Sequence, residues 1–281
     1  MEHLLSVWPN ISEKLKAAKY ILLLTDYDGT LAPIVERPDL ANMSERTREV
    51  LRELAQQHRF RIGILSGRAL TEIKEKVGIS DIIYAGNHGL EIEGPGVNFV
   101  NLQAEKAKPI LRVLYQVLSK SLEATKGALV EDKGLTLSVH YRMVEESKAE
   151  EVKRIFDRYV GAAQAAGQVR ITTGKKVYEV RPAVTWDKGK TIRFLLKKYG
   201  KGSTKSDMLA MYVGDDVSDE DGFKVIGEYE NGFSVFVGEP NIQSAAHYFL
   251  KSTEEVATLL DRLLKQSKRG FGDFGNKEVV L

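Results

Sequence analysis

The order of apolar segments constrains this chain more than any other feature of its sequence. Short runs rich in β-branched and aromatic residues alternate with longer segments in which apolar residues recur at helical spacing. This alternation is typical of a parallel sheet whose faces are covered by helices. The predicted strands are Tyr20–Thr25, Phe60–Leu65, Asp81–Ala85, Met208–Val213 and Phe233–Val237. The helices predicted between them are Ser44–Gln57, Leu70–Val77, Asp187–Tyr199 and Ser218–Gly227. Two of these helices begin with a capping residue, Ser44 or Asp187.

The order of elements changes in the middle of the chain. The glycine-rich stretch 86–100 predicts a hairpin and a hinge. After it the predicted elements are a helix, a strand pair, a second helix and two short strands, at Lys106–Ala124, Ala128–Arg142, Ser147–Ala166, Val169–Thr172 and Val177–Arg181. This is the order of a separate α+β layer. We therefore predict a smaller α+β cap domain at residues 105–181, inserted into a discontinuous α/β core at residues 1–104 and 182–281.

The composition excludes several classes of function. With 41 basic and 39 acidic side chains and a net charge of +2, the chain lacks the basic block of a nucleic-acid-binding protein. It has no cysteine, which excludes disulfides and thiolate metal sites. No apolar run approaches the ~20 residues that cross a bilayer, and the N-terminal segment, interrupted by Pro9, lacks the apolar region of a signal peptide. We expect a monomer in the cytoplasm whose partner is a small molecule.

Two carboxylates follow the first apolar strand, at Asp26 and Asp28, and Gly29 permits a sharp turn after them. In an open α/β sheet the ligand crevice lies at the carboxyl ends of the strands, so both acids are expected where chemistry takes place. For an Asp-x-Asp pair alone, a solvated acidic turn is the commoner interpretation.

Three further segments carry polar groups to the ends of strands or the starts of helices. Ser66 and Arg68 precede a helix, which suits a phosphoryl group, although a serine cap beside a surface arginine is at least as common. Lys188 lies at the start of another predicted helix, where the default interpretation is a lysine exposed on the surface. The third segment has five acids within seven residues, starting at Asp215, and is either well solvated or holds a hard cation such as Mg²⁺.

In this order, the four segments resemble the motifs of haloacid dehalogenase superfamily phosphatases, which have a Rossmann-type core with a parallel sheet. The resemblance implies that Asp26 is the nucleophile and that Asp28 is the general acid and then the general base. It also implies that Mg²⁺ is held by the side chains of Asp26 and Asp215 and by the carbonyl of Asp28. The chemistry requires such groups, because a carboxylate that attacks a phosphate dianion needs positive charge beside it.

The same resemblance implies roles for the groups around the phosphate. Thr30 and Ser66 hold phosphoryl oxygens, and Lys188 neutralises their charge. Arg68, which can pair with the oxygens of a phosphoryl group, is a candidate contact to the substrate on its own chemistry. Within the superfamily, the chain is most similar to trehalose-6-phosphate phosphatases, in segments such as Asp26–Ile34, Ala85–Glu91 and Gly214–Glu220.

The predicted cap also resembles that family, in the segments 130–134, 138–142 and 174–182. This resemblance implies that the sugar contacts are Glu131, Lys133, Lys176 and Glu179, with His140 and Arg142 as further candidates. Charges that alternate along a strand supply donors and acceptors for sugar hydroxyls, but a half-exposed sheet whose charges meet water is an equal alternative. For Asn87 and His88, a structural role and substrate contact are equally good interpretations.

The predicted function is the Mg²⁺-dependent hydrolysis of trehalose 6-phosphate to trehalose and phosphate, the last step of trehalose biosynthesis, through an aspartyl phosphate. Sucrose phosphate and mannosyl- or glucosyl-3-phosphoglycerate are alternative substrates. A catalytically inactive regulatory module of the same fold is the non-enzyme alternative, but such a protein is expected to lack Asp26 or Asp28, and both are present.

Overall fold

The computed structural model describes residues 1–35, 37–174, 176–200, 207–240 and 243–269, and the chain divides into two compact units. The first unit contains Met1–Leu65, Lys76–Ile83 and Lys188–Leu281, and the second contains Ser66–Glu75 and Tyr84–Asp187. The second unit thus contains all of the predicted cap, 105–181, together with three segments assigned to the core from sequence, 66–75, 84–104 and 182–187. The predicted domain boundaries at 104/105 and 181/182 stay a prediction.

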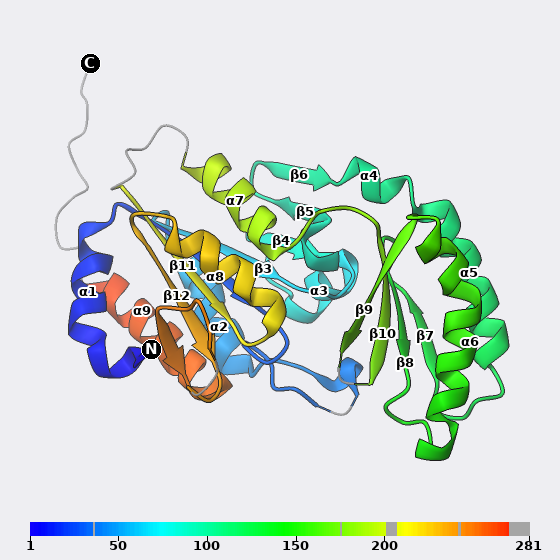
Figure 1. Ribbon diagram of the computed structural model, residues 1–281. Helices are drawn as coiled ribbons and strands as arrows, with labels where there is room; N and C mark the ends of the chain where they lie inside the picture. The colour runs from blue at the N-terminus through cyan, green and yellow to red at the C-terminus, as the bar shows by residue number, and fades with distance from the viewer. Residues whose placement is uncertain (36, 175, 201–206, 241–242, 270–281) are drawn as a thin grey trace. The chain divides into compact units, whose positions relative to one another are not determined.

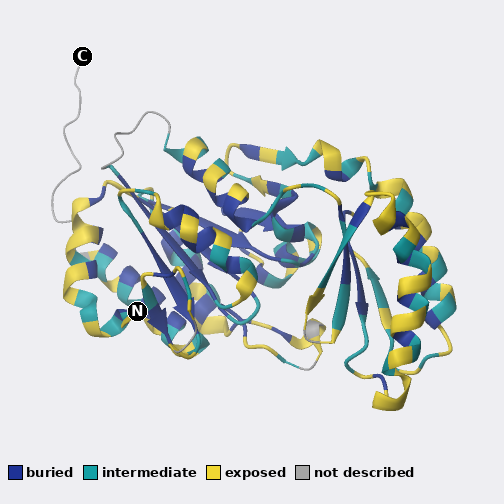
Figure 2. Cartoon of the chain, in the orientation of Figure 1, coloured by how far each residue is buried: buried dark blue, intermediate teal, exposed yellow. Residues whose placement is uncertain are grey.

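In the described part of the first unit, six parallel strands form its sheet. Figure 1 shows them side by side. Their order is β1 (Glu2–His3), β13 (Tyr248–Leu250), β12 (Gly232–Val237), β11 (Met208–Gly214), β2 (Tyr20–Asp26) and β3 (Phe60–Leu65). The central strands β2 and β11 are buried along nearly their whole length (Figure 2). Strands enclosed on both faces need near-continuous apolar runs, which explains why the sequence predicted β2, β3, β11 and β12 within a residue of their ends.

The helices of the first unit are α1 (Trp8–Ala17), α2 (Glu45–Ala55), α7 (Lys188–Tyr199), α8 (Glu220–Gly227) and α9 (Thr253–Arg269), with short 3-10 turns at Leu4–Val7, Pro38–Leu40 and Val217–Asp219. Within this unit α7 packs on α8, and α2 packs on α9. Ser44 caps α2 by accepting a hydrogen bond from the Thr47 amide at 3.1 Å, as its sequence position predicts. The short strands β1 and β13 and the helix α9 were not among the predicted elements. None of the described helices is long and apolar enough to cross a membrane.

In the second unit, strand β4 (Ile83–Gly86) leads through the turn Asn87–Gly89 into the antiparallel strands β5 (Glu91–Gly94) and β6 (Val97–Val100), the hairpin predicted for 86–100. Helix α3 (Leu70–Val77) has the predicted bounds. The helix predicted at Lys106–Ala124 is α5 (Lys108–Leu122), which is two residues shorter at each end, and the short helix α4 (Leu102–Glu105) before it was not predicted. Pro109 explains the start of α5, because a proline, which lacks an amide hydrogen, is tolerated only in the first turn of a helix.

The cap layer of this unit is a four-stranded antiparallel sheet in the order β7 (Leu129–Asp132), β8 (Leu137–His140), β10 (Val177–Pro182) and β9 (Val169–Gly174). Helices α5 and α6 (Glu146–Ala165) cover one face of this sheet with an apolar core (Figure 1). Thr136 and Ser138, which alternate with the apolar residues Leu135, Leu137 and Val139, are buried as well.

Candidate active site

Strand β2 ends at Asp26, the predicted nucleophile. Leu22, Leu23 and Leu24 are fully buried, and Asp26 lies opposite Leu65 of β3 at the carboxyl end of the sheet. The side chain of Asp26 is itself buried, with 8% exposed. The chain then turns back at once, since the amide of Gly29 donates to the carbonyl of Ala32 at 2.7 Å. A buried carboxylate needs a paired positive charge or hydrogen-bond donors to offset the loss of hydration, and other residues of the first unit supply them.

The turn after β2 brings a second carboxylate close to its backbone. Gly29 has φ +86°, and a Cβ atom at this position would lie 2.0 Å from Oδ2 of Asp215. Only glycine meets both demands, a left-handed backbone and the close approach of a side chain. Thr30, fully buried, donates from Oγ1 to Oδ1 of Asp215 at 3.4 Å. Asp28 is half-buried and forms an isolated bridge with Ala32. The predicted contact of Thr30 with a phosphoryl oxygen and the acid-base role of Asp28 stay predictions.

Lys188 links the nucleophile strand to the acidic loop. It is the first residue of α7 and only 4% exposed, and its Nζ donates to Oδ1 of Asp26 at 2.6 Å and to Oδ1 of Asp219 at 2.5 Å. The default sequence interpretation, a surface lysine, is therefore wrong. Burial lowers the pKa of Lys188, but Asp219 and Asp26 raise it by more, so the net pKa lies above its ordinary value and the ammonium stays charged.

Sequence reasoning did not assign a role to Asp219, which is fully buried and accepts four hydrogen bonds. Its Oδ1 accepts from Lys188 and from the hydroxyl of Tyr212, and its Oδ2 accepts from the amides of Asp215 and Asp216 at 3.0 Å each. Both oxygens thus have two donors each, which accounts for the usual capacity of a carboxylate. The acidic run in the sequence contained Asp219 but could not separate it from its solvated neighbours.

Three carboxylates and one ammonium share this buried place. Oxygen atoms of Asp26, Asp215 and Asp219 lie within 4.8 Å of one another. Burial raises the pKa of Asp26 well above its usual range, and Asp219 and Asp215 add to this effect although Lys188 opposes it. Burial, with repulsion from Asp219, likewise raises the pKa of Asp215 to about 7. The excess of negative charge makes this donor set suitable for a hard divalent cation.

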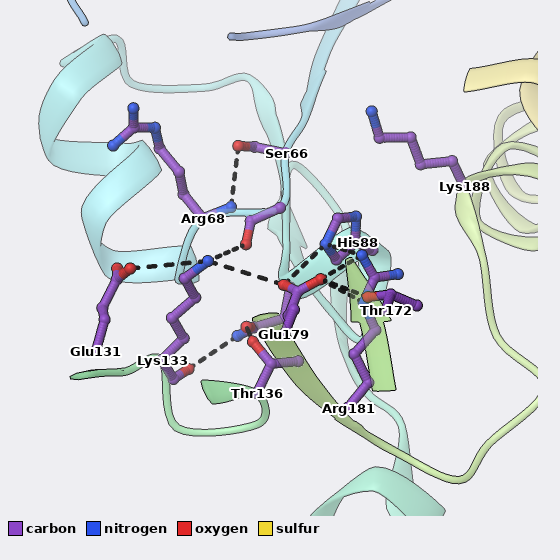
Figure 3. A network of polar contacts seen from close by, with 12 residues as sticks. Ser66, Arg68, His88, Glu131, Lys133, Thr136, Thr172, Glu179, Arg181 and Lys188 are labelled. Atoms are coloured by element: carbon purple, nitrogen blue, oxygen red, sulfur yellow. Dashed lines mark hydrogen bonds and ion pairs between the residues drawn. The ribbon is translucent and has the colours of Figure 1, made fainter. Parts of the chain in front are cut away.

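The second unit gathers a different set of the predicted residues (Figure 3). Lys133 Nζ donates to the carbonyl of Gly67 at 3.2 Å and lies 3.9 Å from Glu131 and 3.8 Å from Glu179. The Lys133 side chain is 11% exposed, and Glu131 also bonds His140 Nε2 at 2.9 Å. Arg68 is buried and pairs with Glu72. These contacts bring together Glu131, Lys133 and Glu179, three of the four residues predicted to contact the sugar.

Glu179 has donors from four sides. Its carboxylate contacts His88 Nε2 at 3.2 Å, Thr172 Oγ1 at 3.3 Å and the guanidinium of Arg181, in addition to Lys133. Burial raises the pKa of Glu179, but these neighbours, His88 first, lower it by more, and the net pKa lies well below its usual range. Glu179 is therefore ionised. Thr172 and Arg181 were not among the residues predicted in this site, because contacts between separate strands leave no trace in local sequence. For His88 the sequence left substrate contact and a structural role equally open.

Three predicted residues lie elsewhere in the second unit or stand in other contacts. Lys176 pairs with Glu146 at 2.7 Å, where both side chains are exposed, and it belongs to the turn between β9 and β10. Arg142 follows β8 and is half-buried. Ser66 is buried, and its Oγ accepts a hydrogen bond from the Arg68 amide at 3.1 Å. The predicted substrate contacts of these residues stay predictions.

A cavity of about 670 Å³ lies in the same unit but contains none of the predicted site residues. It is lined by the segments that precede and follow the cap strands, including Lys106, Gln168 and Trp186. We place the candidate chemistry at the buried acid cluster of the first unit, because the pKa values of two predicted site residues, Asp26 and Asp215, are raised there.

Comparisons with known proteins identify the fold and the family of this chain. The fold is that of haloacid dehalogenase-like hydrolases: one such protein, from Bacteroides thetaiotaomicron, superposes with a TM-score of 0.60 at 18% identity, covering 87% of this chain and 100% of the other. The model of the trehalose-phosphatase family matches residues 24–254, and the chain belongs to that family.

Individual relatives are similar over most of this chain. A probable trehalose-phosphate phosphatase 4 of Oryza sativa is 36% identical over 272 residues, which cover 94% of this chain and 71% of the relative. The C-terminal domain of a Candida albicans trehalose-6-phosphate phosphatase superposes with a TM-score of 0.76 at 25% identity, covering 92% and 96% of the two chains.

Proposed function

We propose that this protein is a Mg²⁺-dependent phosphatase that hydrolyses trehalose 6-phosphate through an aspartyl phosphate on Asp26. The observation that carries the proposal is the ion pair of Lys188 with Asp26 at 2.6 Å, at the carboxyl end of β2 and beside Asp215. A buried carboxylate held against an ammonium is suited to attack a phosphorus atom whose oxygens need positive charge. Membership of the trehalose-phosphatase family supports the substrate.

Asp26 and Asp215 fit the role of metal ligands better than Asp219. The two oxygens of Asp219 already accept four hydrogen bonds, whereas Asp215 is only half-buried and accepts one weak bond from Thr30. The carbonyl of Asp28 completes the proposed set. When bound, Mg²⁺ supplies positive charge that keeps these carboxylates ionised and polarises the phosphoryl group.

The two acids of the turn then act in sequence. The carboxylate of Asp26 attacks the phosphorus, and the bond to the sugar oxygen breaks while Asp28 gives that oxygen a proton. In the second step Asp28 takes a proton from a water molecule that attacks the phosphorus, which releases inorganic phosphate and restores the carboxylate of Asp26. Thr30 and Ser66 are proposed to bind phosphoryl oxygens.

Asp219 holds Lys188 in position for this chemistry. The ammonium has short contacts to Asp26 and Asp219, and Tyr212 and two backbone amides fix the carboxylate of Asp219. The orientation of Lys188 is therefore set before substrate binds, which avoids reorganisation during the reaction.

The sugar is proposed to bind Glu131, Lys133 and Glu179, with Arg68, Arg142 and Lys176 as further contacts. The cluster in the second unit supports the first three, because it presents two carboxylates that each lie within 4 Å of the Lys133 ammonium. Such groups bond sugar hydroxyls as acceptors and donors. We propose a monomer that acts in the cytoplasm, as expected from the sequence.

Phosphate release from a panel of phosphosugars tests the proposal. We expect trehalose 6-phosphate to give the highest kcat/KM, above sucrose 6-phosphate and mannosyl-3-phosphoglycerate, and Asp26→Asn to abolish turnover without loss of fold. Higher activity on another phosphosugar would replace the proposed substrate but leave the chemistry in place. Retention of more than a few per cent of activity by Asp26→Asn would exclude this residue as the nucleophile.

A further inference from the structure

The fully buried amide side chain of Asn87 lies against the turn that carries Lys133. Its Nδ2 donates to the carbonyl of Lys133 at 3.0 Å and to Oε2 of Glu91 at 2.8 Å, and its Oδ1 accepts from Thr136 Oγ1 at 2.7 Å. Thr136 is also fully buried. The orientation of the amide is fixed by these partners, because the reversed amide would face a carbonyl and a carboxylate with its oxygen.

The turn between β7 and β8 has local bonds as well. The amide of Lys133 donates to the carbonyl of Thr136 at 3.0 Å, and Asp132 Oδ1 accepts from the amide of Gly134 at 2.8 Å. These bonds shape the turn but do not join it to another element. Asn87 provides such a connection from the turn that follows β4.

The backbone of Asn87 reaches the other predicted binding segment. Its amide donates to the carbonyl of Arg68 at 2.7 Å, and Lys133 Nζ donates to the carbonyl of Gly67 at 3.2 Å. Asn87, Lys133 and the 67–68 backbone therefore form a closed ring of hydrogen bonds. Within this ring the two ends of Lys133, its carbonyl and its ammonium, are both held.

Asn87 itself is not accessible to a ligand, since none of its surface is exposed. Its backbone has φ +50°, followed by φ +58° at His88 and +88° at Gly89. Asparagine and aspartate tolerate this left-handed conformation better than other residues with a side chain. The site thus calls for a short residue that accepts a positive φ and offers both a donor and an acceptor.

We propose that Asn87 is a positioning residue for substrate recognition: it fixes the Lys133 turn against the 67–68 backbone so that the Lys133 ammonium meets the sugar in a single position. The inference rests on the proposed role of Lys133 in binding the phosphosugar. A displacement of about 1 Å in a positioning group lowers the rate up to about a hundredfold, so a role that acts through another residue is measurable.

Two substitutions disturb the amide without large changes in volume. Asn87→Asp keeps the backbone preference but turns a carboxylate oxygen toward Glu91 and the Lys133 carbonyl. Thr136→Val removes the hydroxyl donor and keeps the shape. We expect each to lower kcat/KM for the phosphosugar roughly tenfold, mainly through KM. Adding Glu91→Gln to Asn87→Asp should recover part of the loss, because the new amide can donate to the aspartate.

A double-mutant cycle with Lys133→Ala separates positioning from general support of the fold. If Asn87 acts through Lys133, then Asn87→Asp and Thr136→Val should change kcat/KM by less than about twofold in the Lys133→Ala background. Thr47→Val in α2 is the matched control: it removes another buried hydroxyl, bonded to Ser44 at 2.8 Å, and should lower the melting temperature without a change in kcat/KM.

Three outcomes would overturn the inference. The first is that Asn87→Asp and Thr136→Val lower kcat/KM as much in the Lys133→Ala background as in the wild type. The second is that neither single variant changes kcat/KM. The third is that Thr47→Val lowers kcat/KM as much as Thr136→Val does. The assays use the phosphosugar that the wild-type enzyme hydrolyses fastest, so a substrate other than trehalose 6-phosphate would change the proposed function without deciding the role of Asn87. If Asn87→Asp does not fold, Thr136→Val carries the same test.

Discussion

Asp215 should destabilise the metal-free protein at neutral and alkaline pH, and replacing it with asparagine should remove this effect. In the folded chain, burial and repulsion from Asp219 raise the pKa of Asp215 from 3.8 to about 7. The folded state therefore binds a proton that the unfolded state has already lost between these two pH values. By linkage, the free energy of unfolding falls as pH rises through this range and is lowest above about pH 7.

The size of the effect follows from the shift. Each pKa unit corresponds to about 1.4 kcal/mol, so a shift of about three units costs on the order of 4 kcal/mol when Asp215 is fully ionised. Between pH 5 and pH 8 the expected loss from this residue is about 2–3 kcal/mol. Asp215→Asn keeps the volume and an acceptor for Thr30 but cannot ionise. In chelator, the variant should gain stability relative to wild type by this amount between pH 5 and pH 8.

Urea unfolding in chelator at pH 5 and pH 8 measures this difference, and groups that titrate in both proteins cancel in the comparison. Asp221→Asn, which changes an exposed aspartate in α8, is the control and should show no gain. Added Mg²⁺ should stabilise the wild type at pH 8 but have a smaller effect on Asp215→Asn, which should also be nearly inactive. If the two proteins have the same pH dependence in chelator, Asp215 is not destabilised by its surroundings and the account of the acid cluster is wrong.

Two further predictions concern the turn after β2 and the sugar cluster. Gly29→Ala should lower kcat/KM at least about a hundredfold, because the new Cβ would displace Asp215. The control is Gly96→Ala, where φ is +68° and the space around the Cβ is open; it should lose about 1–2 kcal/mol of stability but no activity. Equal losses of activity in the two variants would refute the steric argument. In the sugar cluster, we expect kcat/KM for the disaccharide phosphate to fall roughly ten- to a hundredfold in each of the variants Glu131→Ala, Lys133→Ala and Glu179→Ala, but to change little for a small aryl phosphate. The control is Lys120→Ala, at an exposed position, which should change neither activity. Equal losses on both substrates would mean that these charges only support the fold.

The sequence predicted elements well wherever one local pattern was decisive. The buried strands β2, β3, β11 and β12 required continuous apolar runs, and the Ser44 cap marked the start of α2. Local pattern was insufficient for strands of two or three residues such as β1 and β13, which have too few side chains to show a period. It also missed α4, which has only four residues, and placed the start of α5 two residues too early.

The sequence by itself determined that Asp26 and Asp28 stand at the end of a central strand, since a strand and the turn after it are set by neighbouring residues. Only the tertiary structure decided what surrounds them. Lys188 has the sequence context of a solvated lysine, and its burial between Asp26 and Asp219 depends on how α7 packs beside β2 and the acidic loop. In the same way, the bond of Asn87 to Thr136 joins residues 49 positions apart. The physical reason is that burial and hydrogen-bond partners at such separations are properties of packing, to which a local pattern of residue types is insensitive.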